Sequence, residues 1–99
     1  MEFDLNHALV THNESARRFE AVVHGLTAFI VYKILPGRMV IQHTEVPPEL
    51  EAQGLAARLT RAALDYARSK KFEVVPACPY TAAFIAKHPE YNDLLPSPL

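Results

Sequence analysis

A run of small residues stands where a strand-like segment gives way to the longest amphipathic stretch of the chain. Residues 51–58 read Glu-Ala-Gln-Gly-Leu-Ala-Ala-Arg, and they follow Thr44, Glu45, Val46 and two prolines. Glycine and alanine leave backbone N–H groups uncovered, and the first N–H groups of a helix have no internal partner. The helix dipole adds partial positive charge at the same end. The junction therefore predicts a site for the phosphate or diphosphate of a phosphorylated cofactor.

The single cysteine, Cys78, is the second place where the sequence offers chemistry. It follows a strand-like segment over 73–77 and precedes Pro79, which suits the first position of a helix. A thiol at a helix N-terminus has its thiolate favoured, which lowers its pKa below the free value of about 8.5. Cys78 is therefore a candidate reactive thiol. The alternative is a small buried residue that packs beside the cofactor.

His43 is a further catalytic candidate. It lies on a strand-like segment directly before Thr44, and an imidazole can titrate near neutrality. The alternative is a half-buried sheet residue on the face shared with Met39 and Ile41. The N-terminal histidines show no ligand spacing, so no metal site is predicted.

Length and composition limit the classes of protein. The chain has 99 residues, of which 49% are hydrophobic, enough for one domain over 1–95 with a flexible tail over 96–99. The net charge is −1 and Lys and Arg are scattered, which disfavours a nucleic-acid partner. A single cysteine allows no internal disulfide, and no apolar run is long enough to span a bilayer. We therefore expect a cytoplasmic protein with no membrane partner.

Residue patterns predict the sheet that positions these candidates. Runs rich in β-branched and aromatic residues are separated by His24-Gly25 and Pro36-Gly37, which favour turns. The runs suit an antiparallel meander. The predicted strands cover residues 9–12, 19–24, 26–35 and 38–45.

Helical spacing and prolines predict the remaining elements. Pro47 and Pro48 end the sheet pairing, and the apolar stripe that follows predicts a helix over 54–70. A strand over 73–77 is reached by this crossover helix, which favours parallel pairing with the preceding strand. A short second helix is predicted over 79–88. The fold class is therefore α+β: a strand meander, a helix, a parallel strand and a short C-terminal helix.

Together these segments resemble the GNAT superfamily of acetyl-CoA-dependent N-acetyltransferases, in particular a small single-domain branch. Besides the glycine turn, the resemblance is carried by residues 43–48 (HTEVPP), 75–80 (VPACPY, with its Cys-Pro-Tyr motif) and 88–91 (HPEY). It covers about residues 12 to 95. It implies a GNAT-like fold, acetyl-CoA as cofactor, and transfer of an acetyl group to an amine of a protein or small molecule.

The superfamily's turn motif is Gln or Arg, two residues, Gly, one residue, and then Gly or Ala. Glu51, Gly54 and Ala56 follow this spacing, but Glu51 is acidic and would repel a diphosphate unless it turns to solvent. The resemblance also implies that the preceding strand pairs with the pantetheine arm and that the last helix lines the other side. The implied cofactor-binding residues are Thr44, Glu45, Val46, Gln53, Gly54, Leu55, Ala56, Ala57, Arg58, Thr81, Phe84 and Lys87.

The resemblance also bears on chemistry and partners. A cysteine at the position of Cys78 is a proposed catalytic residue in this branch, which implies that it accepts the acetyl group or assists proton transfer. Tyr80 and Tyr91 are alternative proton donors or packing residues. We expect an amine acceptor, in a monomer or weak dimer. The alternative functions are a non-catalytic acyl-CoA-binding or sensing module and an interaction domain that has lost the cofactor.

Overall fold

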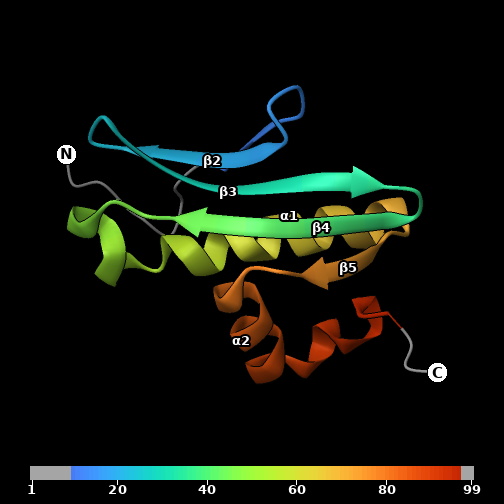
Figure 1. Ribbon diagram of the computed structural model, residues 1–99. Helices are drawn as coiled ribbons and strands as arrows, with labels where there is room; N and C mark the ends of the chain where they lie inside the picture. Colours follow the sequence, from blue (N-terminus) through green and yellow to red (C-terminus); the bar gives the residue numbers. More distant parts are fainter. Residues whose placement is uncertain (1–9, 97–99) are drawn as a thin grey trace.

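A computed structural model of the chain describes residues 10–96, which form one sheet with a long helix packed on one of its faces (Figure 1). The strands are β1 (Thr11–Asn13), β2 (Arg18–Val23), β3 (Leu26–Leu35), β4 (Arg38–Glu45) and β5 (Glu73–Pro76). The helices are α1 (Leu55–Lys70) and α2 (Pro79–Lys87), with 3₁₀ turns η2 (Pro48–Gln53) and η3 (Pro89–Leu94). The strands lie in sequence order, antiparallel from β1 to β4, and β5 runs parallel to β4. The predicted fold class is confirmed.

Two tight hairpins fix the lengths of the long strands. His24 and Gly25 both have positive φ, 52° and 77°, which matches the twist of the strands that flank a two-residue turn. Gly37, with φ of 71°, closes the second hairpin. Strands β3 and β4 begin and end as predicted. Strand β1 begins at Thr11, whereas Leu9, where the prediction begins it, lies outside the described residues.

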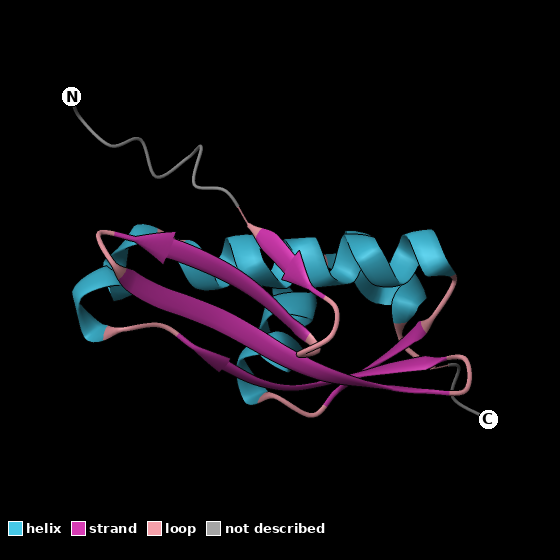
Figure 2. Cartoon of the chain, turned by 90° about the horizontal axis from the view of Figure 1, so that it is seen from above, coloured by secondary structure: helices cyan, strands magenta, loops and turns pink. Residues whose placement is uncertain are grey.

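Helix α1 covers one face of the sheet, as Figure 2 shows from above. Alternate residues of β3 point toward the helix, and Ala28, Ile30 and Tyr32 are buried. Burial of this shared apolar face holds the two layers together. The helix contributes buried residues at helical spacing, namely Leu55, Leu59, Ala63, Leu64 and Ala67.

Backbone conformation sets both ends of α1. Gly54 has a left-handed φ of 77°, so the helix begins one residue later than predicted. Lys71, with φ of 61°, ends it, and its N–H donates to the carbonyl oxygens of Ala67 and Arg68. The 3₁₀ turn η2 before Gly54 was not predicted, because a single short turn carries no helical periodicity.

The C-terminal elements α2 and η3 lie beside β5 and contact α1 (Figure 1). Arg68 of α1 donates to Asp93 Oδ1 at 2.6 Å and to the carbonyl oxygen of Glu90 at 2.9 Å. The Tyr91 ring is buried, and its hydroxyl donates to Asp65 at 3.3 Å. These contacts hold η3 against α1. The predicted tail over 96–99 lies, apart from its first residue, outside the described residues.

Strand β4 contains a β-bulge. Val31 of β3 lies opposite His43, but the next residue, Tyr32, lies opposite Ile41. Gln42 is therefore an extra residue on β4 with no counterpart on β3. A bulge of this kind reverses the side-chain alternation beyond it.

The bulge decides which residues of β4 face the helices. Thr44 lies opposite the buried Ile30 and shares its face, whereas His43 lies on the opposite, exposed face. There the His43 ring stands edge-on to Phe29, with 6.4 Å between ring centroids. The interpretation that His43 shares a face with Ile41 is therefore wrong, because regular alternation does not continue through Gln42.

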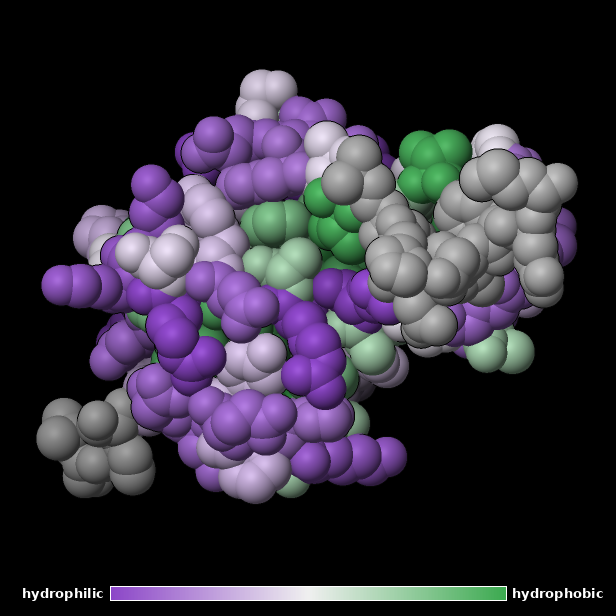
Figure 3. Space-filling view, turned by 180° about the vertical axis from the view of Figure 1, so that it is seen from behind, coloured by the Kyte–Doolittle hydropathy of each residue, from purple (hydrophilic) through white to green (hydrophobic). Residues whose placement is uncertain are grey.

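The surface on the helix side is largely hydrophilic. In Figure 3, which views the molecule from behind, hydrophilic side chains cover most of the surface, and hydrophobic ones show in the centre and in a few smaller places toward one side. Within residues 10–96 no helix is both long enough and apolar enough to cross a lipid bilayer.

Candidate active site

Strands β4 and β5 diverge next to the bulge. Their last aligned pair is Ile41 with Pro76, after which the N–H of Cys78 donates to the carbonyl oxygen of Ile41 at 2.9 Å. The chain then turns into α2, while β4 continues to Glu45 and pairs with β3 alone. The backbone over 42–45 therefore has no strand partner on the side that β5 has left. Such an edge can pair with an extended ligand.

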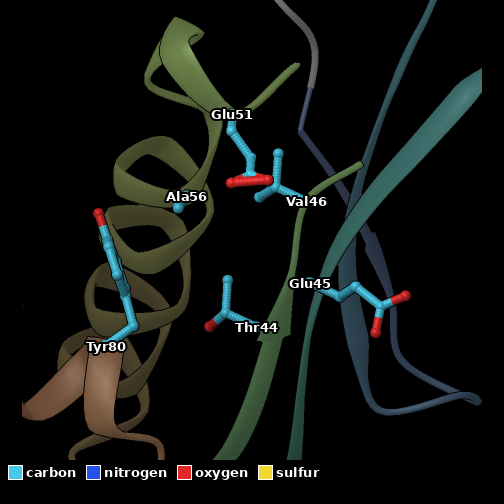
Figure 4. A pocket seen from close by; sticks show the side chains of 6 residues that line it. All are labelled: Thr44, Glu45, Val46, Glu51, Ala56 and Tyr80. Carbon is cyan, nitrogen blue, oxygen red and sulfur yellow. The ribbon is translucent and has the colours of Figure 1, made fainter. Parts of the chain in front are cut away.

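A pocket of about 390 Å³ lies between the end of β4 and the start of α1. Figure 4 shows Thr44 from β4, Ala56 from the first turn of α1 and Tyr80 from the start of α2 around this hollow, with Glu45 directed away from it. Four of the six lining residues were predicted to bind the cofactor, whereas Tyr80 was considered only as a proton donor or a packing residue and Glu51 only as a departure from a motif. The pocket is lined by Thr44, Glu45, Val46, Glu51, Ala56 and Tyr80.

The N-terminus of α1 borders this pocket. The N–H of Arg58 makes the first helical bond, to Gly54 at 3.2 Å, so the N–H groups of residues 55–57 have no helical partner. No side chain caps this end of the helix. A Cβ added to Gly54 would meet nothing within 4 Å, so the space in front of it is open. The arrangement suits an anionic group. Leu55 is buried and can contribute only its backbone.

Cys78 lies behind the pocket, at the position that precedes α2. It is only 4% exposed, and its Sγ lies 3.6 Å from the hydroxyl oxygen of Thr44. Burial alone raises the pKa of the Cys78 thiol. Hydrogen bonds from the backbone N–H of Thr81 and from the Thr44 hydroxyl outweigh burial, so the pKa lies below its ordinary value. This is the direction expected for a thiol at a helix N-terminus.

The hydroxyl of Thr81 is buried close to this thiol. It has no hydrogen bond of acceptable geometry within residues 10–96, so we ascribe the lowered pKa of Cys78 to the Thr81 backbone and to Thr44. Thr81 lines neither of the two pockets described here. Its expected role in cofactor binding stays a prediction.

A second cavity, of about 170 Å³, opens on the other side of Tyr80. Tyr80 lines both spaces and is 40% exposed, so its ring forms the wall between them. Ala57, Phe84 and Lys87, three of the predicted cofactor-binding residues, lie here.

The remaining candidates are not part of this cluster. His43 Nε2 lies 3.2 Å from Glu45 Oε1, with both side chains exposed on the outer face of the sheet. Tyr91 is occupied with Asp65. The structure thus brings Cys78 together with Thr44 and does not bring His43 to them. Across residues 10–96 no cluster of His, Cys, Asp and Glu could hold a metal ion.

The family model for the GCN5-related N-acetyl-transferases matches residues 18–94. The chain belongs to this family. It is 31% identical to Protein NATD1 of Bos taurus over 83 residues, which cover 81% of this chain and 74% of that protein. Protein NATD1 of Homo sapiens is 30% identical with the same coverage. The resemblance inferred from the sequence is confirmed.

A solved structure has the same fold. It is an NMR solution structure of a GCN5-like protein from Staphylococcus aureus, proposed in its description to be an N-acetyltransferase. The TM-score is 0.72 at 23% identity, with 93% of this chain and 91% of that chain covered. The GNAT-like fold is therefore shown over nearly the whole chain.

The residues present fit the coenzyme expected of the family. The open N-terminus of α1 suits a diphosphate, and the unpaired edge of β4 suits an extended arm of amide groups. One residue runs against this fit. Glu51 is exposed but lies in the pocket wall, so the repulsion of a diphosphate considered from the sequence is not removed by its position.

Proposed function

We propose that the protein is an acetyl-CoA-dependent N-acetyltransferase that acts on an amine, either of a small molecule or exposed on a protein. One observation carries the proposal: a single pocket joins the unpaired end of β4 to the uncapped N-terminus of α1 in a chain of this family. When bound, acetyl-CoA supplies an acetyl group activated as a thioester.

Two segments would hold the cofactor through their backbone. Residues 44–46 would pair with the pantetheine arm, and the N–H groups near the start of α1, over 53–58, would bind the diphosphate. Phe84 and Lys87 line the adjoining cavity and would contact the parts of the cofactor that these backbone groups do not bind. These contacts need few particular side chains, which is why small residues suffice at Gly54 and Ala56.

Cys78 is the residue to which we give a chemical role. It would either take up the acetyl group on its sulfur or pass a proton to the departing thiolate. Its lowered pKa and its contact with Thr44 support both roles. The backbone N–H groups on the unpaired edge of β4 are available to a developing oxyanion. His43 lies on the other face of the sheet, so we give it no role in the transfer.

A second candidate function is a non-catalytic acyl-CoA-binding module. One observation favours it: the groups around the Cys78 thiol are hydroxyls and backbone N–H groups of Thr44, Tyr80 and Thr81. None of these groups is a base of the strength of a histidine or a carboxylate. The groups that contact the thiol therefore offer no general base for an acceptor amine.

Two measurements test the proposal. The first is the melting temperature with and without acetyl-CoA, which we expect to rise on binding. The second is amine-dependent release of free thiol from acetyl-CoA, with a lysine peptide and a polyamine as acceptors. Cys78→Ala should keep the thermal shift and lose thiol release. Binding without release for every acceptor would favour the binding module, and absence of both would refute the proposal.

A further inference from the structure

Glu51 is an acidic side chain in the wall of the pocket that borders the proposed diphosphate site. It lies in η2, three residues before Gly54, and its carboxylate points into the 390 Å³ pocket. Figure 4 shows its carboxylate beside Val46, in the space between the end of β4 and the first turn of α1. A ligand held by the N-terminus of α1 would therefore meet this carboxylate.

The charge of Glu51 is not offset by a basic residue within η2. Turn η2 carries Glu49 and Glu51 in its first turn and no basic residue in its last. Within residues 10–96 the structure gives Glu51 no hydrogen bond or ion pair, and the carboxylate does not cap α1. Its negative charge therefore acts on the pocket without satisfying the N–H groups that would bind an anion.

We propose that Glu51 determines how weakly the protein holds its cofactor: its carboxylate repels the diphosphate at the N-terminus of α1 and shortens the time for which coenzyme A stays bound. This inference rests on the proposed function. Two like charges about 4 Å apart in water disfavour association by a factor of about five. The uncharged pantetheine arm, bound along β4, does not experience this repulsion.

A matched pair of substitutions isolates the effect. Glu51→Gln and Glu49→Gln remove the same charge from the same 3₁₀ turn, both at exposed side chains, but only residue 51 lines the pocket. We expect Glu51→Gln to lower the Kd for coenzyme A by about fivefold and to slow its dissociation by a similar factor. Glu49→Gln should change the Kd by less than about twofold, because water screens the more distant charge.

Salt and a truncated ligand provide the controls. At about 1 M salt the advantage of Glu51→Gln should disappear, because the Debye length falls to about 3 Å. Pantetheine, which lacks the diphosphate, should bind wild type and Glu51→Gln equally. Calorimetry measures each Kd, and stopped-flow displacement measures dissociation.

The outcomes separate this inference from the proposed function. If wild type binds coenzyme A and Glu51→Gln binds it no better than Glu49→Gln does, Glu51 has no such role and the proposed function stands. An equal gain with pantetheine would also overturn the role, because the effect would not be due to phosphate. If none of the three proteins binds coenzyme A, the proposed function fails together with the inference.

Discussion

The Thr44 hydroxyl lies 3.6 Å from the sulfur of Cys78, although the two residues are 34 positions apart. The contact spans the gap where β4 and β5 diverge, from the end of one strand to the residue that precedes α2. It joins the wall of the pocket to the thiol behind it. The pKa of the Cys78 thiol depends in part on this contact.

Thr44→Val removes the hydroxyl and keeps the shape of the side chain. Because that hydroxyl helps to lower the pKa of Cys78, the pKa should rise toward its ordinary value. We expect the thiolate fraction at neutral pH to fall by about threefold, as for loss of one hydrogen bond. The pH dependence of iodoacetamide alkylation measures it. Thr27→Val, on the exposed face of β3, is the control, and coincident profiles for wild type and Thr44→Val would contradict the assignment.

Gly54→Ala tests the turn before α1. An alanine at φ of 77° is strained, at a cost of about 1–2 kcal/mol in the free energy of unfolding. Gly37→Ala is a close match, because Gly37 has φ of 71° and a Cβ at either position meets nothing within 4 Å. Urea unfolding should show a similar loss of unfolding free energy for both variants. Only Gly54→Ala should also weaken acetyl-CoA binding, and equal binding by the two variants would argue against the turn as a cofactor site.

Arg68→Gln tests the attachment of η3 to α1. The variant loses the contacts with Asp93 and with the carbonyl oxygen of Glu90, both at the surface. Because exposed ion pairs contribute little, we expect a loss of only about 0.5–1 kcal/mol in urea unfolding, smaller at high salt. Arg38→Gln breaks a single exposed pair with Glu73 and should have a smaller effect. If Arg38→Gln is the more destabilising of the two, the contacts of Arg68 do not hold η3.

His12 should make stability depend on pH. Burial lowers its pKa below 6.5, partly opposed by the charge of Glu14, while its ring stacks on Phe19 with centroids 4.1 Å apart. As the pH falls below about 6.5, the unfolded chain binds this proton first, so the free energy of unfolding decreases until the folded protein also binds it. His12→Gln should flatten this dependence between about pH 7.5 and pH 5. Urea midpoints across that range provide the test. If the stability of His12→Gln varies with pH in parallel with that of wild type, His12 is not the cause of the pH dependence.

Most of the helices and strands could be predicted because each one is set by residues close together in the sequence. Runs of β-branched and aromatic residues between turn-forming pairs predicted β3 and β4, and helical spacing predicted α1. Pro79 marked the start of α2. The 3₁₀ turn η2 was missed, because its residues show neither the spacing of a helix nor the alternation of a strand.

The residues that line the pocket were predicted less evenly. Thr44, Val46 and Ala56, which the family's motif places at the strand and helix ends, line it, and their contact with a cofactor stays a prediction. Tyr80 was considered as a proton donor or a packing residue, whereas it lines both cavities. No pattern in the sequence indicates which way a side chain at a helix start will point.

The order of the elements, the glycine turn and the position of Cys78 before a helix follow from local residue patterns, because each of these depends on neighbouring residues. Which side chains meet depends on the packing of distant segments. The extra residue Gln42 brings Ile41 and Thr44 to one face and sends His43 to the other. The bulge is seen only in how β4 pairs with β3, next to the point where β5 leaves the sheet. The alternation of residues along β4 alone does not predict it. Because of the bulge, Thr44 rather than His43 contacts Cys78.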